Sequence, residues 1–285
     1  MSHKFDKRFL LAHDILPFIR EYSGSTFVIK YGGSVMKDNF LQSSVIKDIC
    51  FLHSLGIKII LVHGGGPFIN DWLNKLNISP QFRDGIRVTD RKTMEIVEMV
   101  LVGQVNKNLV SLFNQNNVLS IGLSGKDSKL IISSPLFSSP DNLVGKIDSI
   151  NNSILKILLD NNYIPVIASV ASDYEGNTHN INADTVAGSI AQSLSAEKLI
   201  LLTDTLGVMS DLDDSSSLFK SLNVDLLKAL KNQKVISGGM IPKVQCCLDA
   251  IKSNVNSAHI ISGNIPNALL YETLTNHRVG SMITL

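Results

Sequence analysis

The chain has 285 residues and a formal net charge of +1, with 44% hydrophobic and 18% charged residues, a composition typical of a soluble globular protein. The balanced charge excludes an extended basic surface, so we expect no nucleic-acid partner. No apolar run reaches the roughly 18–20 residues of a membrane span, so we expect no membrane partner. Three cysteines, of which Cys246 and Cys247 are adjacent, fit neither a disulfide framework nor a zinc site, and we expect reduced thiols.

The N-terminal stretch predicts a helix rather than a targeting signal. Apolar residues across 5–22 have the spacing of an amphipathic helix, with Pro17 inside it. The stretch contains acidic residues and lacks a small-residue cleavage pattern. We therefore expect a mature protein of the cytoplasm, or of the plastid stroma if an organelle encodes it.

Short apolar runs alternate with helical stretches and predict an α/β fold with a mostly parallel sheet. The runs lie in "TFVIKYGG", "IKIILVHGGGP", "NYIPVIASV", "EKLILLTDT" and "SAHIISGN". Helices are predicted near 39–55 and 67–76, after the first two runs. Between 124 and 152 the pattern changes to short alternating pieces, which predict hairpins at an antiparallel edge.

Three polar or glycine-rich stretches follow predicted strands, where ligands of parallel sheets gather. They are Lys30-Tyr31-Gly32-Gly33-Ser34, His63-Gly64-Gly65-Gly66-Pro67 and Thr203-Asp204. Glycines let backbone N–H groups approach an anion, and the following helix N-terminus adds a positive field. We expect a phosphate site here, with ligand-free tight turns as the alternative. Lys30 either reaches that phosphate or extends its ammonium group to solvent.

The common phosphate and nucleophile motifs do not fit these stretches. A Rossmann fingerprint fails at Ile69, where Gly or Ala is required. A P-loop at Gly125-Lys126 fails because Asp127 follows in place of Ser or Thr. A nucleophile elbow fails because Lys126 occupies a glycine position.

Two polar stretches surround the starts of later helices. In "NTHNINADTVAG", Asn180 and Asp184 present an amide and a carboxylate near each other, although Asn182 or Asp184 could simply cap the helix. In "SGGMIPKVQCCLDA", Gly238-Gly239 begin a helix and direct Lys243 toward whatever the glycines bind. Taken singly, Lys243 is an ordinary helix lysine.

The stretch "FRDGIRVTD" at 82–90 predicts a hairpin that turns at Asp84-Gly85. Arg87 on this hairpin has the planar, bidentate group that binds carboxylates, although a single arginine is more often a surface residue.

Five motifs in this order resemble the amino acid kinase family: 30–34, 63–67, 85–89, 180–184 and 238–243. The resemblance runs from about residue 24 to the C-terminus. The sequences GIRVT and NINAD are specific to the branch that phosphorylates N-acetyl-L-glutamate, and the chain resembles its arginine-sensitive, hexameric type. The resemblance implies an open three-layer αβα sandwich with a mostly parallel sheet. It divides the chain into a helical extension (1–23), an acetylglutamate-binding and dimerising N-lobe (24–195) and an ATP-binding C-lobe (196–285).

The implied reaction transfers the γ-phosphoryl of ATP to the γ-carboxylate of N-acetyl-L-glutamate, the second step of arginine biosynthesis. An ionised carboxylate needs no general base, so charge neutralisation and positioning carry the catalysis. The resemblance makes Lys30 and Lys243 the catalytic cations, holds them through Asp184, and places Mg²⁺ on the nucleotide. It assigns substrate binding to Gly65, Gly66, Arg87 and Asn180, and phosphate or nucleotide binding to Gly32, Gly33, Gly65, Thr203, Asp204 and Gly239.

The resemblance also implies regulation by L-arginine. A helix like that at 5–22 interlaces dimers into hexamers in the arginine-sensitive branch, and Lys198 and Glu272 are the expected arginine-site residues. Arg278 stands where that branch usually has glycine, and Ser281 where it has threonine. A nitrogen-signalling regulatory protein is a further possible partner. The alternatives are a kinase acting on glutamate, aspartate, carbamate or UMP, and a catalytically silent nucleotide-binding sensor.

Overall fold

An eight-stranded sheet forms the centre of the molecule. The computed structural model describes residues 7–83, 86–139, 141–233 and 235–285, with side chains from residue 14 onward. Neighbouring strands pair in parallel except β13 and β14, which confirms the predicted mostly parallel sheet. Across the sheet the order is β12 (Ser221–Asn223), β14 (Ser281–Thr284), β13 (Ser257–Ser262), β11 (Lys198–Thr203), β1 (Thr26–Tyr31), β2 (Lys58–His63), β8 (Ile164–Ala168) and β5 (Ser120–Ser124).

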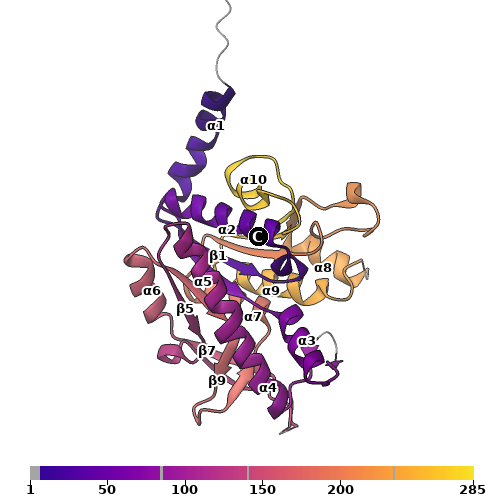
Figure 1. Ribbon diagram of the computed structural model, residues 1–285. Helices are drawn as coiled ribbons and strands as arrows, with labels where there is room; N and C mark the ends of the chain where they lie inside the picture. The colour runs from indigo at the N-terminus through magenta and orange to yellow at the C-terminus, as the bar shows by residue number, and fades with distance from the viewer. Residues whose placement is uncertain (1–6, 84–85, 140, 234) are drawn as a thin grey trace, which may run out of the picture.

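Helices cover both faces of this sheet and complete the predicted three-layer sandwich (Figure 1). Strand residues alternate between two cores: Phe27 and Ile29 of β1 belong to one, and Val28 belongs to the other. The first core also holds α2 (Asn39–Ser54), α3 (Gly66–Lys75), α4 (Arg91–Glu98), α5 (Asn106–Gln115) and α10 (Ala268–Leu274). The second holds α6 (Ser153–Asp160), α7 (Ala183–Ser193), α8 (Val224–Asn232) and α9 (Met240–Lys252). The helices predicted near 39–55 and 67–76 are thus confirmed as α2 and α3.

A separate four-stranded sheet corrects the expected antiparallel edge. The hairpin predicted within 124–152 exists as β6 (Ile131–Pro135) and β7 (Gly145–Ile150), which pair antiparallel. These strands join β9 (Val170–Ser172) and β10 (Thr178–Asn180) instead of the main sheet. The main sheet has its antiparallel strand at β14. The polar and apolar residues mixed in β6 and β7 suit a sheet with one solvated face, so the pattern revealed the hairpin but not its neighbours.

Short elements connect these layers. The predicted hairpin at 82–90 is present as β3 (Phe82–Arg83) paired antiparallel with β4 (Ile86–Arg87), while its predicted turn at 84–85 lies outside the described residues. Short 3₁₀ helices occur at η1 (Ser34–Lys37), η3 (Asp127–Lys129) and η4 (Ser215–Ser217).

The N-terminal helix α1 (Lys7–Tyr22) projects from the body of the molecule (Figure 1). It lies within the predicted range 5–22, whose first two residues are outside the described part. At its end the Tyr22 ring packs edge-on against Phe27 of β1, with centroids 5.5 Å apart. The helix therefore joins the central sheet beside strands from both halves of the chain, because β1 pairs with β11. The predicted lobe boundary near 195 stays a prediction.

A long helix runs from α4 through a π-helical segment, η2 (Met99–Val105), into α5. Within the described residues, this Arg91–Gln115 helix alone has the length and hydropathy to cross a membrane. Core helices of globular proteins pass the same test, and Val97, Leu109 and Phe113 of this helix are fully buried in the core. We therefore treat it as a core helix. π-helical segments occur frequently at functional sites.

Candidate active site

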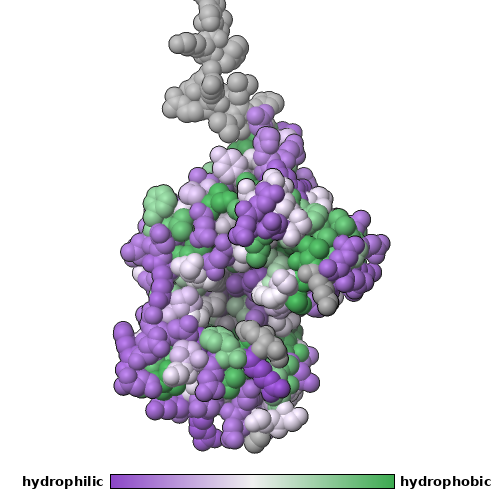
Figure 2. Space-filling view, turned by 90° about the vertical axis from the view of Figure 1, so that its right-hand side faces the viewer, coloured by the Kyte–Doolittle hydropathy of each residue, from purple (hydrophilic) through white to green (hydrophobic). Residues whose placement is uncertain are grey.

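The carboxyl ends of β1, β2 and β11 bring the predicted glycine motifs together. Register pairs Tyr31 with His63, so the two glycine loops begin at the same level of the sheet. The Gly64 N–H donates to the Tyr31 carbonyl over 3.1 Å. Figure 2 shows the molecule hollowed across its middle on the side where α3 and α8 lie in Figure 1.

Two lysines from distant parts of the chain meet at one aspartate. Lys30 Nζ lies 3.1 Å from Asp184 Oδ1, and Lys243 Nζ donates to Asp184 Oδ2 over 2.7 Å. The Asp184 side chain is 6% exposed. Burial opposes its ionisation, but the Lys30 and Lys243 ammonium groups outweigh this and lower the pKa of Asp184. Burial lowers the pKa of Lys30, and the Asp184 charge opposes that effect.

The structure settles which residue caps α7. Asn182 is the N-cap, and its Oδ1 accepts from the backbone N–H groups of Asp184 and Thr185 over 2.8 and 3.2 Å. Asp184 lies in the first turn, where its carboxylate is free to contact the two lysines. The capping alternative therefore holds for Asn182 and not for Asp184.

Each glycine of the first loop makes room for a charged group. A Cβ at Gly32 would lie 3.0 Å from Lys30 Nζ, so a side chain would obstruct the ammonium group. Gly33 has φ 93°, and a Cβ there would lie 2.7 Å from Asp204 Oδ1. That carboxylate accepts from Ser34 N over 3.1 Å and from Ser34 Oγ over 2.8 Å. Asp204 thus holds the loop after β1, a function not expected from the sequence.

The second glycine loop rests on a buried histidine and asparagine. His63 Nδ1 donates to the Gly64 carbonyl over 2.9 Å, and His63 Nε2 accepts from Asn106 Nδ2 over 3.0 Å. Asn106 Nδ2 also donates to the Val166 carbonyl over 2.8 Å. Complete burial lowers the pKa of His63 to about 4, so the ring is neutral near pH 7 and has this one tautomer. No motif singled out Asn106; its place near the π-helix became visible only in the fold.

A small pocket of about 230 Å³ lies between the two glycine loops. Lys30 and Asp184 line it together with Gly32, Gly33 and 64–66. A larger pocket of about 750 Å³ adjoins it through the Asp184–Lys243 contact and is lined by Thr203, Asp204, Gly239 and Lys243 among others. The predicted phosphate and nucleotide residues therefore line two adjoining pockets: Gly32, Gly33 and Gly65 line the small one, and Thr203, Asp204 and Gly239 line the larger one.

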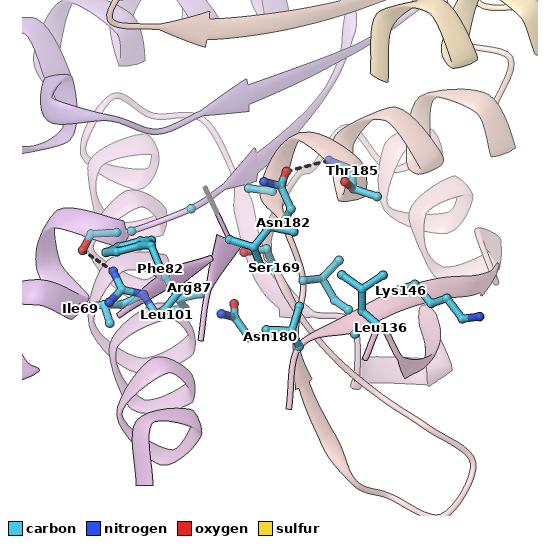
Figure 3. A pocket seen from close by; sticks show the side chains of 18 residues that line it. Ile69, Phe82, Arg87, Leu101, Leu136, Lys146, Ser169, Asn180, Asn182 and Thr185 are labelled. Atoms are coloured by element: carbon cyan, nitrogen blue, oxygen red, sulfur yellow. Dashed lines mark hydrogen bonds between the residues drawn. The ribbon is translucent and has the colours of Figure 1, made fainter. Parts of the chain in front are cut away.

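A third pocket, of about 300 Å³, shares 64–66 with the small pocket and is lined by Arg87 and Asn180 (Figure 3). Arg87 Nη2 donates to Asn70 Oδ1 over 2.5 Å, and its guanidinium carbon lies 4.8 Å from the Phe82 ring centroid. Among the described residues, Arg87 Nη1 is buried without a hydrogen-bond partner. An unpaired buried guanidinium nitrogen is costly, so this pocket suits an anionic group.

Asn180 reaches the same pocket from β10 and is fixed by the chain around it (Figure 3). Its Nδ2 donates to Thr89 Oγ1 over 3.1 Å, and Thr89 Oγ1 donates to the Arg87 carbonyl over 3.0 Å. Arg87 and Asn180 are thus linked through Thr89. The sequence indicated neither Thr89 nor the stacking ring of Phe82 as part of the pocket.

The two expected arginine-site residues are linked by a chain of contacts, and Lys198 begins β11 whereas Thr203 of the nucleotide-side pocket ends it. Lys198 Nζ donates to Ser257 Oγ over 3.2 Å and lies 4.5 Å from the Tyr22 ring centroid. The Ser257 hydroxyl contacts His259 Nε2 over 3.1 Å, and His259 Nδ1 contacts Glu272 Oε1 over 2.9 Å. Burial lowers the pKa of Lys198. We call these five residues the Lys198 cluster.

Comparisons with known proteins found a matching family, similar sequences and a similar fold. The model of the amino acid kinase family matches residues 25–262. The acetylglutamate kinase of Gracilaria tenuistipitata var. liui is 56% identical over 286 residues, which cover 100% of both chains. That of Nostoc sp. is 52% identical over 270 residues, 95% of this chain and 91% of the other. Among solved structures, the fold is similar to that of N-acetylglutamate synthase from Neisseria gonorrhoeae complexed with coenzyme A and N-acetyl-glutamate. The TM-score is 0.87 at 23% identity, and the match covers 98% of this chain and 64% of the synthase.

Proposed function

Because the chain belongs to the amino acid kinase family, we propose that it transfers the γ-phosphoryl group of ATP to the γ-carboxylate of N-acetyl-L-glutamate. The products are N-acetylglutamyl 5-phosphate and ADP, and the reaction is the second step of arginine biosynthesis. Acetylglutamate kinases 56% and 52% identical over nearly their whole length support this substrate. The observation that carries the proposal is the convergence of Lys30 and Lys243 on Asp184 between two pockets.

The Arg87 pocket takes the acyl acceptor. Arg87 Nη1, buried and without a partner, binds the α-carboxylate, and Asn180 orients the acetylated end of the molecule. The γ-carboxylate then extends past Gly65 and Gly66 toward the small pocket. An ionised carboxylate is already a nucleophile, so its attack needs no general base.

The small pocket holds the migrating phosphoryl group. Backbone N–H groups of Gly33 and Gly65 bind its oxygens, while the Lys30 and Lys243 ammonium groups offset the charge that builds up in the transition state. Asp184 keeps the two cations from separating. ATP fills the 750 Å³ pocket, with its phosphates directed at Lys243 and the Gly239 end of α9.

Bound with the nucleotide, Mg²⁺ would neutralise part of the phosphate charge. Within the described residues, no three His, Cys, Asp or Glu side chains gather as metal ligands. The pocket's residues fit a cation bound mainly by phosphate oxygens and water. Of the acidic side chains that line this pocket, Asp204 is the one that faces Gly33.

Two alternatives remain separable by experiment. A related kinase for glutamate, aspartate, carbamate or UMP would share the cations but not the Arg87–Asn180 pocket's preference for an acetylated amino acid. A silent nucleotide-binding sensor would not need the buried Lys30–Asp184–Lys243 constellation, which is costly to maintain. Coupled ADP release with MgATP and each acceptor tests all three. We expect turnover with N-acetyl-L-glutamate; activity on free glutamate without activity on the acetylated form would refute the proposal.

We also propose that L-arginine regulates the enzyme at the Lys198 cluster, which α1 reaches through Tyr22. Glu272 would bind the guanidinium group, although its carboxylate already accepts from Val279 N and Gly280 N over 2.9 and 3.1 Å. Inhibition assays over a range of L-arginine test this. A dimer or hexamer, and binding of a nitrogen-signalling protein, stay predictions. Algal and cyanobacterial relatives support a plastid or cytoplasmic location.

A further inference from the structure

Helices α7 and α9 approach each other closely one turn beyond the Asp184–Lys243 contact. Cys246 of α9 lies 3.0 Å, Sγ to O, from the Asp184 carbonyl, to which its S–H donates. On α7, Gly188 faces the same sulfur: a Cβ at this position would lie 2.5 Å from Cys246 Sγ. Real Cβ atoms do not make contacts this short, so a side chain at 188 collides with the Cys246 sulfur in its present rotamer, whereas the Cys246 carbonyl oxygen and Cβ, at 3.8 and 4.0 Å, would be in ordinary contact.

The spacing along each helix connects this contact with the catalytic centre. Asp184 and Gly188 are four residues apart on α7, and Lys243 and Cys246 are three apart on α9, so each pair lies on one helix face. The Cys246–Gly188 contact and the Lys243–Asp184 ion pair therefore lie on successive turns of one interface between α7 and α9. Because the helix backbone is stiff, a change of the helix separation at the Cys246–Gly188 contact also changes it at the Lys243–Asp184 ion pair.

We propose that the Gly188–Cys246 contact is a positioning device that sets the distance of Lys243 from Asp184 and from the transferring phosphoryl group. This inference rests on the proposed phosphoryl transfer. Cys246 does not touch substrate; it acts through Lys243. Burial raises the pKa of the Cys246 thiol to about 12, so the group is a neutral, weakly donating spacer and not a nucleophile.

The size of the sulfur matters more than its hydrogen bond. A thiol is a weak donor, while atoms of a packed interface resist overlap steeply. A methyl group at Gly188 would have to displace the Cys246 sulfur by about 1 Å to restore an ordinary contact, and in the proposal this displacement moves α9 because the Asp184 carbonyl holds the sulfur in place. A displacement of about 1 Å in a catalytic group can cost roughly 100-fold in rate.

A steric-rescue experiment on the full-length protein tests the proposal. We expect Gly188→Ala to lower kcat about 10–100-fold while the KM values for MgATP and N-acetyl-L-glutamate change less than about threefold. Cys246→Ala removes the sulfur, and the remaining Cβ would lie 4.0 Å from the new methyl group. The double variant Gly188→Ala/Cys246→Ala should therefore recover at least tenfold of the lost kcat. Thermal unfolding of both variants, with kcat referred to folded protein, distinguishes repositioning of Lys243 from a general loss of stability.

Two controls make the outcome decisive. Gly103→Ala, another helical glycine with open space around it, should leave kcat unchanged. If Gly188→Ala does not fold, the double variant still decides: a folded, active double variant supports the proposal, and a folded, inactive one overturns it. An unaffected kcat in Gly188→Ala, or no rescue in the double variant, also overturns it. A wild-type protein without turnover on the acetylated substrate would instead refute the proposed function.

Discussion

Lys30 and Lys243 come from opposite ends of the chain, yet their ammonium groups contact the two oxygens of one carboxylate. The distances to Asp184 are 3.1 Å and 2.7 Å, and all three side chains are largely buried. Two buried cations repel each other, so this arrangement is stable only with the shared anion between them. In the proposed reaction, the same two cations would face the entering phosphoryl group from the strand β1 and the helix α9.

Removing the charge of Asp184 should therefore disorganise both lysines. We expect Asp184→Asn to lower kcat about 100- to 1,000-fold, as for loss of a preorganised electrostatic contact. Steady-state kinetics with MgATP and N-acetyl-L-glutamate measure this, with thermal unfolding as the test of folding. Asp160→Asn is the matched control because its ion pair with Lys58 is exposed. A kcat within threefold of wild type would contradict the assigned function of Asp184.

Arg87 should determine affinity for the acceptor and not for the nucleotide. We expect Arg87→Lys to raise the KM for N-acetyl-L-glutamate at least tenfold, because an ammonium group cannot reproduce the planar fork or the stacking on Phe82. The KM for MgATP should stay unchanged. Arg83→Lys, an arginine on the neighbouring strand that does not line the pocket, is the control. Equal effects on both KM values would argue against the acceptor site.

Asn106 supports the second glycine loop through its hydrogen bond to His63. Asn106→Ala leaves His63 Nε2 and the Val166 carbonyl without their donor in a fully buried place. We expect the free energy of unfolding to fall by about 2–3 kcal/mol and kcat to fall several-fold because Gly64 loses its anchor. Urea unfolding and kinetics measure the two effects. Asn108→Ala, on the exposed side of the same helix, should change neither.

The strand ends made the grouping of the candidate-site residues predictable from the sequence. Lys30 precedes two glycines at a strand end, and Lys243 follows Gly239 near a helix N-terminus. Parallel strands and helix N-termini place such groups at one edge of the sheet, so both stretches predict a phosphate site. The sheet and its helices followed from the alternation of apolar runs and helical stretches, whereas the family followed from the resemblance of five motifs. The order of strands did not: nothing in the 124–152 pattern says that β6 pairs with β9.

Contacts between residues far apart in the chain had no signal in the sequence. Asn106 and His63 meet only because α5 lies beneath β2, and Cys246 faces Gly188 only because α9 crosses α7. Both contacts depend on tertiary packing, which periodicity does not encode. Asp204 was expected at the nucleotide, and its hydrogen bonds to Ser34 show that one acidic residue serves the loop as well.

The Lys198 cluster gives a regulatory prediction that rests on the proposed arginine site. Arg278 Nη1 lies 3.5 Å from Glu272 Oε1, so the chain's own guanidinium group occupies the carboxylate that L-arginine would bind. We expect Arg278→Gly to lower the half-inhibitory concentration of L-arginine severalfold, with unchanged kcat in its absence. Unchanged or weaker sensitivity would contradict self-occupation. No response in either protein would show that the cluster is not an arginine site.

Asp48 of α2 should make stability depend on pH in the direction opposite to most carboxylates. Burial raises its pKa to about 7, against a smaller opposing effect of the Leu269 backbone N–H. The native state thus keeps a proton that the unfolded chain releases near pH 4, so this residue makes the protein less stable as pH rises from about 4 to 7.

Asp48→Asn removes the ionisable group, so the variant should be more stable than wild type at pH 8, by on the order of 2–4 kcal/mol. The difference should shrink as pH falls and vanish near pH 4. Urea unfolding at pH 4.5, 6 and 8 measures it. Asp160→Asn, whose carboxylate is exposed, should show no such gain at pH 8. If Asp48→Asn were less stable than wild type at pH 8, the buried carboxylate would have to be ionised and held by its surroundings.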